Sequence, residues 1–70
     1  MKLRATKFYK SLDDYNAVAY AEGFCGGKKG ATELEQLSAW QYIKDNELHR
    51  SLQGFFGRTV ERLTDGGLIN

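Results

Sequence analysis

Apolar residues recur at helical spacing in three stretches of the chain. The most regular stretch lies in the last third, where six apolar positions follow one side of a helix: Leu48, Leu52, Phe55, Phe56, Val60 and Leu63. This spacing predicts a helix over roughly 46–66. Gly54 and Gly57 interrupt the pattern, and each glycine inside a helix costs about 1 kcal/mol relative to alanine. The helix is therefore either continuous or broken into two near Gly54–Gly57.

A second stretch predicts a helix over roughly 11–23. Ser11 can accept a hydrogen bond at the helix start, and Asp14 stands three residues later, as in a capping box. Apolar residues at helical spacing predict one side that packs against a core: Phe8, Leu12, Tyr15 and Ala19. The helix ends near Gly23, because more glycines follow within a few residues.

The third stretch predicts a helix over roughly 32–45. Thr32 and Glu35 have the spacing of a second capping box, and Asp45-Asn46 is a natural stop. Its large apolar residues spread over a wide arc: Leu34, Leu37, Trp40, Tyr42 and Ile43. Such an arc indicates contacts on more than one side of the helix. A homodimer that completes this arc is one way to supply them.

The glycine-rich stretch over 23–31 predicts a linker between two helices. It does not match a phosphate-binding loop, because Lys28 is followed by Lys29 where that motif needs serine or threonine. Cys25 lies in this linker without a general base in sequence reach, so we interpret it as a small, partly buried residue.

Residues 1–10 form a basic segment. They contain four basic residues and no acidic one, whereas the rest of the chain has six basic and nine acidic residues. Leu3, Ala5 and Tyr9 alternate with polar residues, which predicts an extended arm or an edge strand. The net charge of +1 therefore combines a basic arm with an acidic body. This distribution makes nucleic acid a less favoured partner.

The length of 70 residues limits the chain to one domain, over 1–70. Its single cysteine excludes an internal disulfide, and one cysteine with one histidine cannot complete a structural zinc site. No apolar run reaches the length of a membrane span, and no signal-peptide pattern is present. We therefore predict an all-α cytoplasmic domain of three helices with a short basic N-terminal arm, and no contact with a membrane.

Catalytic chemistry has no support in the sequence. His49 is the lone histidine, and the acidic residues lie mostly near helix ends, where the helix dipole explains several of them. No pair of carboxylates forms an acid–base couple. We expect no catalytic residue, no metal ligand and no cofactor, and hence a protein that is not an enzyme.

Phe55 and Phe56 are candidates for binding a partner. Two adjacent residues on a helix cannot both point into one narrow seam, so one can lie in the core while the other is exposed. An exposed phenylalanine beside Arg58 would suit a protein interface, where aromatic residues and arginine dominate binding energy. The alternative is that both phenylalanines are buried in a small helical core.

The last third also permits a helix-turn-helix. Its first helix would be Glu47–Leu52, its turn Gln53–Phe55 and its recognition helix Phe56–Asp65. The exposed side of the recognition helix would present Arg58, Thr59, Glu61 and Arg62. This hypothesis fails if the two arginines face inward.

From Ala39 onward the chain resembles a family of small, uncharacterised proteins of tailed phages. The matching residues are Ala39-Trp40-Gln41, Asp45, Leu48, Leu52-Gln53-Gly54-Phe55-Phe56-Gly57-Arg58-Thr59, Leu63, Gly67, Leu68 and Ile69. The chain departs from the family pattern at Glu47 and His49-Arg50, and its first 30 residues have no counterpart. The resemblance covers about the last 30 residues.

The resemblance implies a phage origin and an accessory role in the cytoplasm of an infected bacterium. Packing alone does not demand the polarity of Gln53, Arg58 and Thr59. Gln53 or Thr59 could cap a helix, and Arg58 could bind Asp45 or Glu61. Alternatively, they form a recognition surface together with Phe55 or Phe56. The residues expected to bind the partner are Gln53, Phe55, Phe56, Arg58, Thr59 and Arg62.

Overall fold

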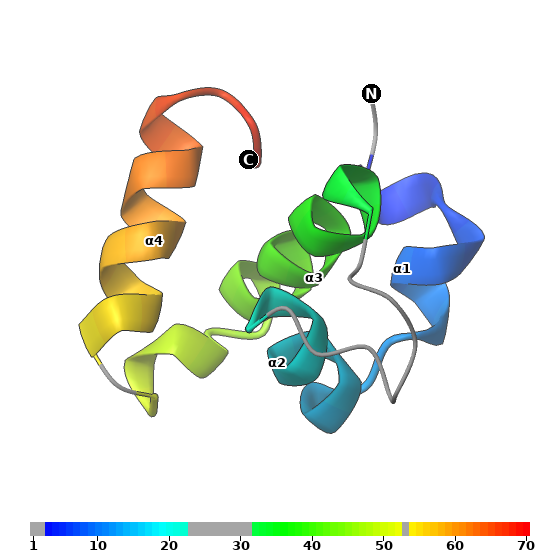
Figure 1. Cartoon of the computed structure of the whole chain (residues 1–70), viewed down its shortest axis with the longest axis horizontal. Coiled ribbons are helices and arrows are strands. Elements are labelled where there is room, and N and C mark those ends of the chain that lie inside the picture. The colour runs from blue at the N-terminus through cyan, green and yellow to red at the C-terminus, as the bar shows by residue number, and fades with distance from the viewer. Residues whose placement is uncertain (1–2, 23–31, 53) are drawn as a thin grey trace.

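The computed structural model describes residues 3–22, 32–52 and 54–70, and every regular element in these ranges is helical (Figure 1). In chain order the elements are the 3₁₀ helix η1 (Leu3–Ala5), α1 (Lys7–Ser11), α2 (Asp14–Ala21), α3 (Glu33–Asp45), the 3₁₀ helix η2 (Leu48–Arg50) and α4 (Gly54–Asp65). The predicted all-α class is confirmed. The expected linker over 23–31 lies outside the described residues.

Helix α3 is the centre of the fold. It contacts each of the other elements, and α2 packs along it most extensively. Its buried residues are Ser38, Ala39, Trp40, Gln41 and Ile43. The wide apolar arc of α3 is therefore covered largely by the chain's own helices, although Leu34 remains 41% exposed.

Thr32 and Glu35 form the predicted capping box at the start of α3. The Thr32 hydroxyl accepts from the Glu35 backbone N–H at 3.1 Å, and the Glu35 carboxylate accepts from the Thr32 N–H at 3.0 Å. The helix ends at Asp45, and the Asn46 side chain donates to the Tyr42 carbonyl at 3.0 Å. Both predicted ends of this helix are confirmed.

The predicted start of the preceding helix at Ser11 is wrong. Ser11 is the last residue of α1, and its hydroxyl donates to the Phe8 carbonyl at 2.8 Å. Asp13 caps α2 instead, because its carboxylate accepts from the Asn16 N–H at 2.8 Å. An ionised carboxylate is a stronger acceptor than a hydroxyl and interacts favourably with the positive end of a helix.

The expectation of an extended N-terminal arm is also wrong. The described part of the basic segment forms η1 and α1, and Thr6 caps α1 by accepting from the Tyr9 N–H at 3.1 Å. Leu3 is buried in the core, so both short helices lie on α3 rather than in solvent. A buried anchor and a helix cap together outweigh the weak period-two pattern.

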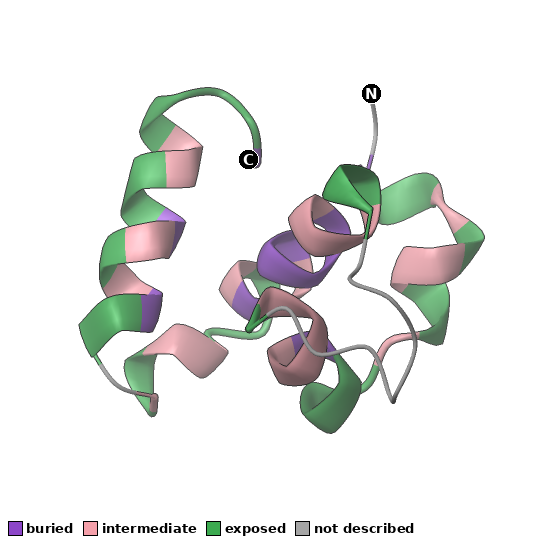
Figure 2. Ribbon diagram, viewed as in Figure 1, coloured by how far each residue is buried: buried purple, intermediate pink, exposed green. Residues whose placement is uncertain are grey.

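The expected helix over 46–66 is broken, as one of the two alternatives stated. The chain turns at Glu47, whose backbone is left-handed with φ of 55°, makes the single turn of η2, and starts α4 at Gly54. Along α4, Phe56 and Val60 are buried on the side that faces α3 (Figure 2). The break thus turns α4 so that its apolar seam meets the core.

The C-terminal stop of α4 follows the predicted pattern. Gly67 adopts φ of +76°, its N–H donates to the Thr64 carbonyl at 3.0 Å, and the Leu68 N–H donates to the Leu63 carbonyl at 3.0 Å. These two hydrogen bonds define a Schellman cap. The tail then folds back and buries Ile69, while Leu68 stays exposed. The core residues are Leu3, Ala17, Ala39, Trp40, Ile43, Phe56, Val60 and Ile69.

Candidate binding surface

One side of α4 carries most of the residues expected to bind a partner. At 100° per residue, Phe55, Arg58, Thr59 and Arg62 fall within an arc of about 100°. Arg58 and Arg62 are exposed, Thr59 is partly buried, and Phe55 is 48% exposed. We call these four residues the α4 surface. Gln53 lies outside the described residues.

Phe56 does not belong to the α4 surface, because it is only 6% exposed and packs in the core. Its ring centroid lies 5.5 Å from Trp40, and that of Phe55 lies 6.1 Å from Trp40 on an edge-to-face contact. The two phenylalanine rings are 5.2 Å apart. Of the two alternatives for these residues, the structure shows the one in which one phenylalanine is buried and the other is exposed. The contact with Trp40 therefore holds the exposed Phe55 ring in place.

Arg58 and Thr59 are not used as structural ties in the way expected. The Thr59 hydroxyl donates to the Phe55 carbonyl at 2.9 Å, which is a bond within the helix and not a cap. Among the described residues Arg58 makes no ion pair, so the expected tie to Asp45 or Glu61 is wrong. The physical reason is that Asp45 is already bound by another arginine. Arg58 therefore stays available at the surface.

The first helix of the expected helix-turn-helix is absent from this region. Residues Glu47–Leu52 form only the turn of η2, and α4 begins at Gly54 rather than at Phe56. Glu47 breaks the helix with its left-handed backbone, and its carboxylate pairs with Arg50 at 2.9 Å. The region thus contains one full helix.

A polar cluster around Asp45 joins both ends of the described chain to α3. Arg4 binds the Asp45 carboxylate through two nitrogens, each at 2.7 Å, and the Tyr9 hydroxyl donates to it at 2.5 Å. The buried Gln41 amide donates to Asp45 at 3.0 Å and accepts from the Asn70 N–H at 2.7 Å. We call these five residues the Asp45 cluster. Without these hydrogen bonds, η1, α1 and the C-terminal tail would be held on α3 by apolar contacts alone.

The cluster shifts the pKa values of its members. The Arg4 guanidinium and the hydroxyl of Tyr9 hold the pKa of the Asp45 carboxyl below its ordinary 3.8, against the effect of its partial burial. Burial and the hydrogen bond to Asp45 raise the pKa of Tyr9 to about 12. A carboxylate held ionised by several donors is a weak proton acceptor. The arrangement therefore supports structure better than proton transfer.

Sequence reasoning did not find the Asp45 cluster, although one signal was present. A carboxylate in the last turn of a helix opposes the negative end of the helix dipole. Such a position favours a cation nearby, and Arg4 supplies it from 41 residues away.

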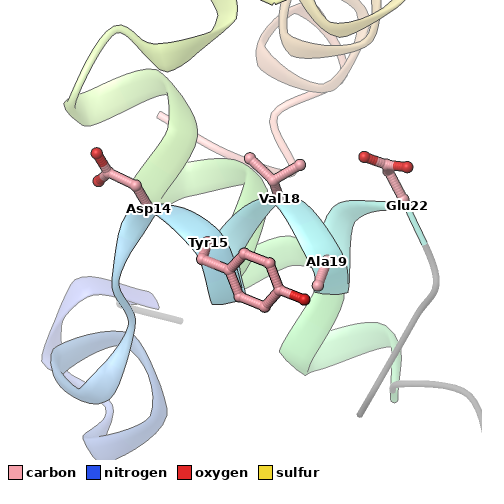
Figure 3. Close-up of a pocket in the computed structure, with 5 residues that line it drawn as sticks. All are labelled: Asp14, Tyr15, Val18, Ala19 and Glu22. Atoms are coloured by element: carbon pink, nitrogen blue, oxygen red, sulfur yellow. The ribbon is translucent and has the colours of Figure 1, made fainter. Parts of the chain in front are cut away.

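A groove of about 480 Å³ runs along α2, lined by Asp14, Tyr15, Val18, Ala19 and Glu22. Asp14, Val18 and Glu22 project from the same edge of the helix, while Tyr15 and Ala19 lie beside them (Figure 3). The expectation that Tyr15 packs in the core is wrong, because its side chain is exposed. The chain breaks between α1 and α2, so the helical register counted from Phe8 does not continue through Tyr15.

The remaining candidates add no reactive site. Cys25 lies outside the described residues, and His49 is partly buried, with no hydrogen-bond partner for its buried Nδ1 in the described part of the chain. Within residues 3–22, 32–52 and 54–70, no group of three His, Cys, Asp or Glu side chains is placed to hold a metal ion. No helix in these ranges has the length and apolar character needed to cross a membrane.

Comparison of the chain with models of protein families, with curated proteins and with solved structures gave no match.

Proposed function

We propose that the chain is a non-enzymatic accessory protein of tailed-phage origin that binds a protein of the infected bacterium and modulates or inhibits it. One observation carries this proposal. Phe55 is half exposed although Trp40 and Phe56 hold its ring in place. An aromatic side chain that is both exposed and fixed loses little conformational freedom on binding, which favours affinity.

The charges beside Phe55 support a protein partner. Arg58 and Arg62 are exposed on the same side of α4, and arginine and aromatic residues are enriched among binding hot spots. The sequence resemblance to tailed-phage proteins includes Phe55 and Arg58, and it supports a role in the cytoplasm of an infected bacterium. In that setting, binding to a host protein serves host takeover or defence against host immunity.

The test is a pull-down from the host with the wild type and the Phe55→Ala/Arg58→Ala variant. The wild type should capture a host protein that the variant loses, and the purified protein should bind the wild type directly. Leu68→Ala is the matched control, because Leu68 is an equally exposed apolar residue away from α4. Capture of the same proteins by wild type and variant, or of none, contradicts the proposal.

Binding of DNA through α4 is the second candidate, because Arg58 and Arg62 are exposed on this helix, even though the first helix of a helix-turn-helix is absent. The α4 helix also exposes Glu61 and Asp65, which cancel the charge of both arginines. This alternative predicts duplex DNA binding that weakens steeply with salt and is lost in an Arg58→Ala/Arg62→Ala variant. Absence of binding at low salt removes it.

A further inference from the structure

The α2 groove combines exposed apolar surface with carboxylates at both ends. Asp14, Val18 and Glu22 stand at positions i, i+4 and i+8, so they form one ridge. At a rise of 1.5 Å per residue, the two acidic residues are separated by about 12 Å along the helix axis. Tyr15 and Ala19 line the adjacent side of the same groove (Figure 3).

Tyr15 is the exposed member of the four tyrosines. Its side chain is 82% exposed, whereas Tyr20 packs edge-to-face on Phe8 and Tyr9 packs on Tyr42. A tyrosine offers a large apolar contact area together with a hydroxyl, and it is enriched in binding hot spots. Tyr15 is therefore an aromatic side chain at the groove that takes no part in the core.

The charge of this surface has one sign. Every charged residue from 11 to 22 is acidic, and among the described residues none of them has an ion-pair partner. The Tyr42 hydroxyl donates to one Asp14 oxygen at 3.0 Å and fixes that carboxylate at one end of the groove. Because burial and this hydrogen bond raise the pKa of Tyr42, the phenol keeps its proton and remains a donor at neutral pH.

Glu22 is placed where an isolated helix does not favour it. It is the C-cap of α2, so its carboxylate lies at the negative end of the helix dipole. A cation bound there would relieve this repulsion. Glu22 also lines a second groove of about 260 Å³ together with Leu52, Phe55 and Phe56, so the two grooves meet at this residue.

We propose that the α2 groove docks a basic segment of a partner protein, with one cationic side chain at Asp14, another at Glu22 and an apolar side chain between them over Val18. A helical segment meets this spacing with lysines or arginines eight residues apart, and an extended segment with lysines or arginines about four residues apart. The site uses no residue of the α4 surface and stands independently of its function.

The test uses a fluorescent helical peptide with two lysines eight residues apart and a leucine midway. Binding to the whole protein is followed by anisotropy at low salt, and the site is mapped by amide NMR shifts. The matched peptide carries glutamates in place of the lysines. We expect the lysine peptide to bind, to shift amides of α2, and to weaken as salt rises, and the glutamate peptide not to bind.

Two variants decide the outcome. Tyr15→Ala should weaken binding about tenfold, as for an interface hot spot, and Glu22→Gln a few-fold, as for an exposed ion pair. Neither change removes a buried contact, so both variants should fold, and Glu61→Gln on α4 serves as the control. Equal binding of the two peptides, no binding at low salt, or unchanged affinity in both variants overturns the proposal. So does a homodimer in sedimentation that Tyr15→Ala dissociates, because the groove then takes a second copy.

Discussion

Removal of the Asp45 carboxylate tests how much the polar cluster stabilises the fold. Asp45 accepts hydrogen bonds from Arg4, Tyr9 and Gln41. In Asp45→Ala the Gln41 amide, which is 1% exposed, loses its acceptor, at about 1–3 kcal/mol. The ion pair adds at most about 1 kcal/mol, because the Arg4 side chain is 49% exposed. We expect a loss of about 1–4 kcal/mol in the free energy of unfolding.

The magnitude is large relative to the whole domain. A chain of this length has a total stability of about 4–10 kcal/mol. Asp45→Asn keeps an acceptor for Gln41 but removes the charge, so it should cost less, about 1 kcal/mol. Urea unfolding at pH 7, followed by Trp40 fluorescence, measures both variants. Glu61→Gln removes an exposed carboxylate outside the cluster and should change stability by less than about 0.5 kcal/mol.

The pH dependence gives an independent check. The pKa of Asp45 is lower in the folded protein than its ordinary 3.8, so its contribution is present above that pH. The contribution is lost as the pH falls through the folded pKa, where the carboxylate becomes protonated. The stability difference between wild type and Asp45→Asn should therefore shrink below about pH 4. A difference that stays constant down to pH 2, or Asp45→Ala as stable as Glu61→Gln, refutes the reasoning.

Three further predictions concern single side chains. Burial raises the pKa of Tyr9 to about 12, so ultraviolet titration should show one phenol that ionises near pH 12, and this transition should be absent in Tyr9→Phe. The wild type should lose stability between pH 10 and 12, and an equal loss of stability at alkaline pH in wild type and Tyr9→Phe contradicts the prediction. Ser38→Ala should raise the unfolding free energy by about 1 kcal/mol, since the buried Ser38 hydroxyl has no partner among the described residues; destabilisation in urea would show a missed hydrogen bond. Gly57→Ala should stabilise α4 by about 1 kcal/mol because a Cβ there meets open space, whereas Gly67→Ala should destabilise the fold by about 1 kcal/mol because the φ of Gly67 is +76°. Thermal melts in which Gly67→Ala is more stable than Gly57→Ala contradict this prediction.

Local signals in the sequence were sufficient for both ends of α3 and for the C-terminal end of α4. The capping box of Thr32 and Glu35 and the stop at Gly66-Gly67 depend on residues a few positions apart, and both are found in the structure. The division of Phe55 and Phe56 between surface and core is one of the two alternatives that helical geometry allowed. Each of these features is decided within one or two turns of helix.

The N-terminal segment could not be predicted in the same way. Helix α1 has five residues and η1 has three, which is too short for a helical period to appear. Their position depends on Leu3, which is buried, and on Arg4, whose partner Asp45 lies 41 residues away. Tyr15 was misplaced for a related reason, since a short break in the chain changes the register of every residue after it.

The candidate site was predicted in part. The sequence identified the α4 surface by combining an exposed aromatic residue with arginines on one helix side. It did not identify the α2 groove, because the spacing of Asp14, Val18 and Glu22 has meaning only once the helix bounds are known. A single sequence says least about two features: which residues far apart in the chain contact each other, and at which residues each helix begins and ends.

The Asp45 cluster has a mechanical consequence. The two end segments of the described chain are held on α3 at Gln41 and Asp45, which are one helical turn apart. A force that pulls these segments apart thus acts on a few hydrogen bonds and on the nearby contacts of Leu3 and Ile69. It does not act directly on the packing between α2 and α3. Under tension the ends should detach first, and the central helix pair should yield as a separate, later event.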